Sequence, residues 1–221
     1  MQVRHYLQFK DFTREEYNHL FGRARWIKDQ FKRYVTHMPL HDRTLAMIFE
    51  KHSTRTRVSF EVGLRELGAN VMFLNANDIQ LGRGEPIRDT ARVLGRMVHG
   101  AVFRTFAQAD VEEFARYASI PTINALTDEE HPCQILADIF TFQEKQGSIR
   151  GKIVTFVGDG ACNVPASWIF AAAKIGFELR IAAPKAFQPP LALLERAGFT
   201  HVHAQPSPTG EIIQGDRKSV V

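Results

Sequence analysis

The regular alternation of short apolar runs with amphipathic stretches restricts the fold of this 221-residue chain more than any other feature. Each apolar run has the length of a strand and is bounded by turn residues, and each amphipathic stretch repeats apolar side chains at helical spacing. The expected strands are 44–49, 70–74, 101–104 and 120–123, and the expected helices are 13–34, 53–67, 86–98, 109–118 and 132–147. Such alternation is typical of a parallel sheet with crossover helices.

A second unit with the same pattern begins at Lys152. The expected strands are 153–157, 179–183 and 200–203, and the expected helices are one that ends near Ile175 and one at 191–197. Residues 205–221 contain Pro206, Pro208 and Gly210, and we expect a turn or a frayed end there. Because three strands are fewer than the usual number of about five or six, the second sheet is expected to be incomplete. The predicted fold class is therefore α/β, with two domains that each contain a parallel sheet flanked by helices, the second incomplete.

Composition excludes several classes of protein. Hydrophobic residues make up 44% and charged residues 24% of the chain, as in globular proteins, so a disordered or fibrous chain is not expected. No apolar run reaches the ~20 residues of a membrane-spanning helix, and no signal-peptide core follows the N-terminus. The cysteines Cys133 and Cys162 are too few for a disulfide framework. We expect a cytoplasmic protein with no membrane partner.

The charge balance favours a small anionic ligand over nucleic acid. The chain has 28 Lys and Arg against 24 Asp and Glu, so its net charge is +4 with neutral histidines. The denser basic stretches lack interleaved aromatic residues, and no zinc-finger or basic-zipper spacing is present. A modest positive excess can instead attract an anionic metabolite. No nucleic-acid partner is expected.

The segment from Phe49 to Glu61 is the strongest local signal, because a strand ends, a turn rich in Ser, Thr and Arg follows, and a helix begins. The first N–H groups of a helix lack partners within the helix, so this end favours an anion. Ser53, Thr54 and Thr56 add hydroxyl groups, and Arg55 offers a guanidinium group that matches phosphate oxygens. The alternative is a solvated, capped helix start with surface arginines. We predict an anion site here.

Two further positions are candidates for chemistry. Arg104 ends an expected parallel strand, where ligands of open α/β sheets bind, although a surface ion pair would explain it equally well. His131 and Gln134 stand at a helix start. Zinc at His131 and Cys133 is disfavoured, because no further Cys or His follows at ligand spacing. The turn Gly158-Asp-Gly160 lacks the third glycine of a dinucleotide fingerprint, and a tight turn explains it.

Four blocks of sequence follow one another at characteristic distances. They are Phe49-Glu-Lys-His-Ser-Thr-Arg-Thr-Arg-Val-Ser-Phe-Glu61, Leu81-Gly-Arg-Gly-Glu-Pro-Ile-Arg-Asp-Thr-Ala-Arg-Val-Leu94, Arg104-Thr105, and Leu126-Thr-Asp-Glu-Glu-His-Pro-Cys-Gln-Ile-Leu-Ala-Asp138. In order and spacing the chain resembles the ornithine carbamoyltransferases of the aspartate/ornithine carbamoyltransferase superfamily over roughly residues 1–185. Lys51-His52 resembles the ornithine type, since the aspartate type typically reads Asn-Pro there.

The resemblance implies transfer of a carbamoyl group from carbamoyl phosphate to the δ-amine of ornithine in arginine metabolism, with no metal or organic cofactor. It implies that the phosphate is held by Ser53, Thr54, Arg55 and Thr56. Arg104 would bridge the phosphate and the carbonyl oxygen. Thr56, Arg104 and His131 would stabilise the developing oxyanion and are the expected catalytic residues.

The remaining implied roles concern the carbamoyl amide, ornithine and assembly. Gln134 would bind the amide, and Asn163 would contact the backbone atoms of ornithine. In a homotrimer, Gln80 would reach carbamoyl phosphate in a neighbouring subunit. We expect Arg57, one helical turn beyond Ser53, to be a structural ion-pair partner.

The resemblance also divides the chain into domains. A carbamoyl-phosphate-binding domain would span 1–147, including the start of a linking helix at 132–146. A partial ornithine-binding domain would span 148–221, with 204–221 an atypical tail. The downstream Asp, Ser-Met-Gly and His-Cys-Leu-Pro segments of the family are missing, and Cys162 stands where Asn is usual. We therefore expect a truncated or frameshifted chain. The alternatives are a non-catalytic remnant that binds carbamoyl phosphate, a fragment that assembles with full-length subunits, and a carbamoyltransferase with another amine acceptor.

Overall fold

Two compact units make up the chain in the computed structural model, which describes residues 3–75, 84–199, 201–207 and 210–216. One unit contains the residues through Leu7 and Glu15–Asp128, and the other contains Gln8–Arg14 and Glu129–Val221. This spatial division falls before the boundary predicted at 147/148. Helix α5 (Pro132–Gln146) belongs to the second unit because it packs against helix α6 (Asn163–Ala171) of that unit.

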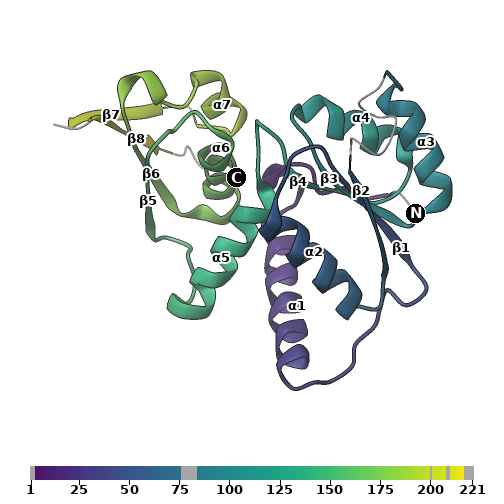
Figure 1. Cartoon of the computed structure of the whole chain (residues 1–221). Helices are drawn as coiled ribbons and strands as arrows, with labels where there is room; N and C mark the ends of the chain where they lie inside the picture. Colours follow the sequence, from purple (N-terminus) through teal and green to yellow (C-terminus); the bar gives the residue numbers. More distant parts are fainter. Residues whose placement is uncertain (1–2, 76–83, 200, 208–209, 217–221) are drawn as a thin grey trace. The chain divides into compact units, whose positions relative to one another are not determined.

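The first unit is built on a four-stranded parallel sheet with the strand order β2-β1-β3-β4 (Figure 1). Its strands are β1 (Thr44–Phe49), β2 (Asn70–Asn75), β3 (Gly100–Arg104) and β4 (Thr122–Leu126). Its helices are α1 (Arg14–Lys32), α2 (Thr54–Glu66), α3 (Ile87–Met97) and α4 (Gln108–Ala118). Arg14, the first residue of α1, belongs to the second unit. These bounds confirm the predicted alternation. The strand predicted at 120–123 begins later, at Thr122, because Pro121 has no N–H to donate to the ladder.

Side chains alternate between the two faces of this sheet, and each face has its own apolar core. Ile48 of β1 faces a core that includes Phe103 and Phe114, whose rings meet edge to face with centroids 5.3 Å apart. Met47, the preceding residue of β1, faces a second core that includes Leu64 of α2. Both faces are therefore buried, as is typical of a parallel sheet covered by helices.

Helices α3 and α4 approach each other closely because one contact residue is a glycine. A Cβ atom built on Gly95 of α3 would come within 1.9 Å of the carbonyl oxygen of Ala118 in α4. No side chain fits at that distance, so the missing side chain of Gly95 sets the spacing of the two helices.

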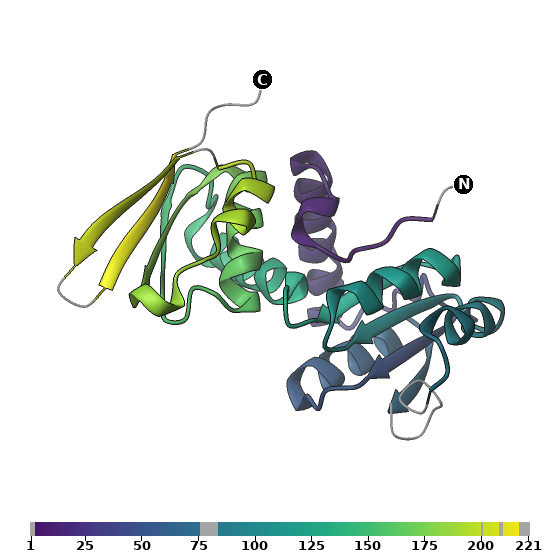
Figure 2. The ribbon, with the colours of Figure 1, turned by 90° about the horizontal axis from the view of Figure 1, so that it is seen from above.

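The second unit carries a four-stranded sheet with the strand order β5-β6-β8-β7. Its strands are β5 (Ile153–Val157), β6 (Glu178–Ala183), β7 (His201–Ser207) and β8 (Gly210–Asp216), and its helical elements are η1 (Phe9–Asp11), α5, α6 with the π-helical turn η4 (Ala172–Gly176), η5 (Lys185–Phe187) and α7 (Leu191–Arg196). Strands β5 and β6 are parallel, whereas β8 pairs antiparallel with both β6 and β7. In Figure 2 the hairpin of β7 and β8 (yellow) extends this sheet.

The α/β class is confirmed in both units, but two details predicted for the second unit are wrong. Its sheet has four strands rather than three and is mixed rather than parallel, and the segment predicted as a turn or a frayed end is a hairpin. The β-branched Ile212 and Ile213 favour the second strand of this hairpin. Pro206 is tolerated because β7 is an edge strand.

Candidate functional site

A cavity of about 380 Å³ lies in the first unit, where β1 and β2 end and α2 begins. The strand ends, the loop after β1 and the start of α2 line it with Phe49, Lys51, His52, Ser53, Thr54, Arg57, Val58, Phe73 and Asn75. The carboxyl ends of parallel strands and the N-terminus of a helix are the places where anionic ligands bind in open α/β sheets. The cavity therefore lies at the position of the predicted anion site.

The start of α2 is capped by its own sequence. Ser53 is the N-cap residue, and its Oγ accepts the N–H of Thr56 at 3.2 Å. The N–H groups of Thr54 and Arg55 have no carbonyl group within the helix to bond to. The first turn also contains no acidic residue. An anion in the cavity would therefore meet the positive end of the helix dipole without repulsion from the first turn.

The residues predicted to hold phosphate occupy different positions in the structure. Ser53 and Thr54 line the cavity, and Thr56 is half-buried behind the cap. Arg55 is exposed and is not among the lining residues. Gln80 falls outside the described residues.

Arg57 is held in the cavity wall by two contacts. Its guanidinium carbon lies 3.5 Å from the centroid of the Phe73 ring, and its Nε lies 3.6 Å from Glu61 Oε2. The ion pair expected for Arg57 is confirmed. Its place in the cavity wall was not predicted, because the stacking partner comes from β2 and helical spacing does not reveal it.

Arg104 is the last residue of β3 and is in register with Phe49 of β1. Its carbonyl oxygen accepts the N–H of Glu50 at 2.9 Å. Within the described ranges, its buried Nε has no hydrogen-bond partner. Burial also lowers the pKa of the guanidinium group. Because an unpaired buried donor is costly, this group is well suited to bind an acceptor on a ligand.

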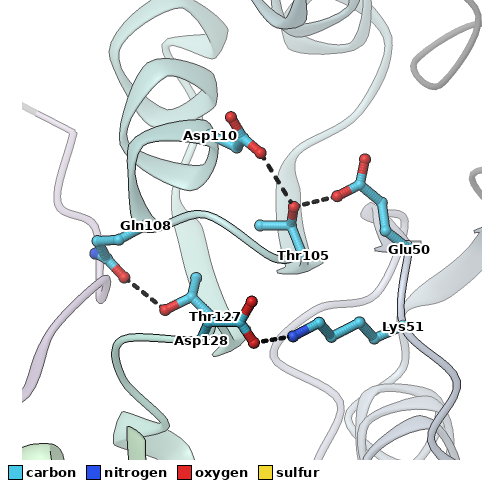
Figure 3. A network of polar contacts seen from close by, with 7 residues as sticks. All are labelled: Glu50, Lys51, Thr105, Gln108, Asp110, Thr127 and Asp128. Atoms are coloured by element: carbon cyan, nitrogen blue, oxygen red, sulfur yellow. Dashed lines mark hydrogen bonds and ion pairs between the residues drawn. The ribbon is translucent and has the colours of Figure 1, made fainter. Parts of the chain in front are cut away.

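A polar network connects the strand ends near Arg104 (Figure 3). The fully buried Thr105 donates its hydroxyl to the carboxylate of Glu50, and the same oxygen lies 3.4 Å from Asp110 Oδ2. Neither Glu50 nor Thr105 was among the predicted site residues. Their position directly after β1 and β3 was the only available signal, and it does not reveal that they are bonded to each other.

A second pair in the same network involves Lys51, which follows Glu50. Its ammonium group forms an ion pair with Asp128 after β4, and it lies 4.4 Å from the centre of the Phe106 ring. Thr127, which precedes Asp128 in the chain, donates its hydroxyl group to the side-chain oxygen of Gln108 at 2.9 Å. The loops that follow β1, β3 and β4 are therefore fixed to one another by side chains.

In the second unit, a hydrogen bond links the start of α5 to α6. His131 is the N-cap residue of α5, and its backbone N–H donates to Ser167 Oγ at 2.8 Å. Ser167 is fully buried on α6, one turn after Asn163, the first residue of that helix. Gln134 is exposed and donates its side-chain amide to Asp138 at 2.8 Å.

Glu130 is a buried acid that was not among the predicted site residues. Its Oε2 accepts the backbone N–H of Phe9 at 3.2 Å. Burial raises the pKa of the Glu130 carboxyl group to about 7, and Asp11 adds to this shift. The Phe9 N–H and the positive charges of Lys10 and Arg196 oppose it.

The cysteines give no indication of a metal site. Burial raises the pKa of the Cys133 thiol to about 12, so it is not a thiolate at neutral pH. The Cys162 thiol donates to the carbonyl oxygen of Asp159 at 3.3 Å. Among the residues that the structure describes, no three His, Cys, Asp or Glu side chains gather in a way that could hold a metal ion. Over the same part of the chain, no helix has both the length and the apolar character needed to cross a membrane.

Comparison with protein families gives two matches that together cover most of the chain. Residues 4–144 match the model of the aspartate/ornithine carbamoyltransferase carbamoyl-P binding domain. Residues 150–210 match the model of the aspartate/ornithine carbamoyltransferase Asp/Orn binding domain.

Similar proteins carry the name ornithine carbamoyltransferase. The one from Ralstonia pickettii is 52% identical over 206 residues, which are 93% of this chain and 67% of that protein. The one from Bordetella avium is 58% identical over 186 residues, or 84% and 59% of the two chains. The solved structure from Burkholderia thailandensis has a TM-score of 0.84 at 51% identity and covers 87% of this chain and 66% of that one. This chain therefore spans about two thirds of the length of the relatives it matches.

Proposed function

Because the chain belongs to the aspartate/ornithine carbamoyltransferase family, we propose that it transfers the carbamoyl group of carbamoyl phosphate to the δ-amine of ornithine, giving citrulline and phosphate. The observation that carries the proposal is the cavity at the start of α2, which Ser53, Thr54 and Arg57 line. The phosphate group of carbamoyl phosphate suits this cavity in charge, and the matching family domain binds that compound.

Within the first unit, we assign the phosphate to the hydroxyl groups of Ser53 and Thr54 and to the first N–H groups of α2. Arg55 and Thr56 complete this set in the proposal. Arg104 would bridge the phosphate and the carbonyl oxygen, which is supported by its buried and unpaired Nε.

The chemistry requires stabilisation of negative charge rather than a covalent intermediate. Attack by the neutral amine places negative charge first on the carbonyl oxygen and then on the leaving phosphate. We assign Thr56, Arg104 and His131 as donors to these oxygens. Removal of one such donor typically raises the barrier by about 2.7–4 kcal/mol.

Gln134 and Asn163 are proposed to bind the carbamoyl amide and the backbone atoms of ornithine, respectively. Gln134 donates to Asp138, so it has to exchange this bond for one to the substrate. Asn163 at the start of α6 is held near the buried Ser167 by the helix itself.

The setting of this activity is part of the same proposal. We place the enzyme in arginine biosynthesis in the cytoplasm, as a homotrimer in which Gln80 reaches carbamoyl phosphate bound to a neighbouring subunit. The positive charge of the site suits carbamoyl phosphate, and neither nucleic acid nor a membrane enters the proposal as a partner.

Binding of carbamoyl phosphate without transfer is the second candidate function. It is favoured by one observation: the carbamoyl-P domain match spans residues 4–144, whereas the Asp/Orn domain match spans only residues 150–210.

The two candidates are separated by measuring citrulline formation and carbamoyl phosphate binding on the same purified chain. Transfer predicts citrulline from the wild type and a loss of about hundredfold or more in Arg104→Ala. Arg116→Ala, an exposed position on α4, is the matched control and should retain the wild-type rate. Binding of carbamoyl phosphate without citrulline formation would support the second candidate. If the chain neither binds carbamoyl phosphate nor forms citrulline, both candidate functions are contradicted.

A further inference from the structure

We infer that Thr105 is a positioning residue for Arg104, because its hydroxyl group and the Glu50 carboxylate lock the end of β3 to the end of β1. The inference rests on the proposed function, since the guanidinium group that it positions is the one assigned to carbamoyl phosphate.

Glu50 contacts two successive residues of the neighbouring strand end. Its N–H donates to the carbonyl oxygen of Arg104 at 2.9 Å, and its carboxylate accepts the hydroxyl group of Thr105. Thr105 is also tied to β4, because its N–H donates to the carbonyl oxygen of Leu126 at 3.1 Å. The peptide group that directly follows the Arg104 Cα is thus bonded to both flanking strands, β1 and β4.

The same bonds fix the wall of the cavity. The chain runs from Glu50 directly into Lys51, His52 and Ser53, all of which line the cavity. A displacement of Glu50 would therefore move this wall and the backbone of Arg104 relative to each other. Lys51 adds a second attachment through Asp128, whose N–H donates to the carbonyl oxygen of Phe106 at 2.8 Å.

The hydroxyl group of Thr105 is needed because it faces two carboxylates. It has one hydrogen to donate, and Figure 3 shows Glu50 and Asp110 approaching its oxygen from two sides. Without the hydroxyl group the two acids would face each other with no donor between them, and like charges repel. The expected result is a displacement of Glu50 away from Asp110 and, with it, of the Arg104 backbone.

The test compares carbamoyl phosphate binding by isothermal titration in three variants of the full chain. Thr105→Val keeps the shape but removes the donor, and we expect binding about tenfold weaker. Thr105→Ser restores the donor, and we expect affinity close to that of the wild type. Thr127→Val is the matched control, because Thr127 is equally buried in the same network but donates to Gln108 rather than to the end of β1.

Thr105→Ala provides a second variant in case the valine methyl group prevents folding. Wild-type affinity in folded Thr105→Val or Thr105→Ala would overturn the inference. Equal weakening in Thr127→Val would also overturn it, because the effect would then be a general loss of core stability. If the wild type itself does not bind carbamoyl phosphate, the proposed function fails first, and this result is distinct from either outcome for Thr105.

Discussion

The carboxylate of Glu130 accepts the backbone N–H of Phe9 at 3.2 Å, although the two residues stand 121 positions apart in the chain. This bond attaches the short helix η1 to the start of α5 within the second unit. It also places an acid in surroundings that penalise its charge, and the stability of that unit should depend on pH as a result.

The pH dependence follows from the pKa of Glu130, which is 4.5 for the ordinary carboxyl group and about 7 in the folded chain. Between these values the folded state binds more protons than the unfolded state. The free energy of unfolding should therefore fall as pH rises from about 4.5 to 7, by roughly 3 kcal/mol in total. Urea denaturation at pH 5 and pH 8, followed through Trp168 fluorescence in a Trp26→Phe background, measures this fall.

Glu130→Gln should remove most of that pH dependence and stabilise the second unit at pH 8. Glu129→Gln, at the exposed neighbouring position, should leave the fall unchanged. Identical pH profiles for the wild type and Glu130→Gln would show that Glu130 does not carry the effect.

Glycine substitutions on two helices of the first unit should have opposite effects. A side chain at Gly95 would collide with the carbonyl oxygen of Ala118, so Gly95→Ala should destabilise the first unit by about 3 kcal/mol or more. Gly63 in α2 has open space around it, so Gly63→Ala should stabilise by about 0.5–1 kcal/mol. Thermal unfolding of both variants against the wild type tests the pair, and equal destabilisation would contradict the close approach of α3 and α4.

Two arginines of α2 pair with the same acid but differ in their relation to the cavity. Arg57 lines the cavity, whereas Arg65 lies two turns further on, and both contact Glu61. Arg57→Leu should weaken carbamoyl phosphate binding by about tenfold or more, since it removes a positive charge from the cavity wall and charged contacts contribute roughly 1.5–3 kcal/mol. Arg65→Leu changes the net charge equally and should bind as the wild type does. Equal losses would mean that overall charge, rather than the cavity wall, attracts the phosphate.

The rate of citrulline formation should increase with pH above neutrality. The amine of ornithine must be neutral to attack, and an alkyl amine of this kind has an ordinary pKa near ~10.4. At subsaturating ornithine, the rate should rise about tenfold per pH unit between roughly pH 7 and 9. A flat profile would indicate that release of products, not the attack, limits the rate.

The parts of the fold with strong local signals were predictable from sequence. The four strands of the first sheet and their crossover helices follow from apolar periodicity, because both faces of the sheet are buried and the helices have a single apolar face. The hairpin of β7 and β8 was missed, since its prolines and glycine indicate a turn but do not determine whether strands pair on either side. Strand β4 begins at Thr122 and not at the predicted residue 120, because Pro121 cannot donate an N–H to the sheet.

The candidate site was predictable only where neighbours in sequence are neighbours in space. Ser53, Thr54 and their helix start form one contiguous segment, and their place in the site was therefore predictable. The contact between Thr105 and Glu50 joins two strand ends, and the stacking of Arg57 on Phe73 joins a helix to a strand. Such pairs depend on strand order and register, which a single sequence does not determine.

The strand order of the second sheet has a consequence for how this unit assembles. Strand β7 comes before β8 in the chain, yet it reaches the sheet only through β8, which lies between β6 and β7. Strand β7 therefore cannot join the sheet before β8 has been made, because β8 is the strand that connects it to β6. A proteolytic cut between Ser207 and Gly210 would leave β7 attached to the chain through α7 but would separate β8, its neighbour in the sheet, so a single cleavage would weaken the attachment of two of the four strands.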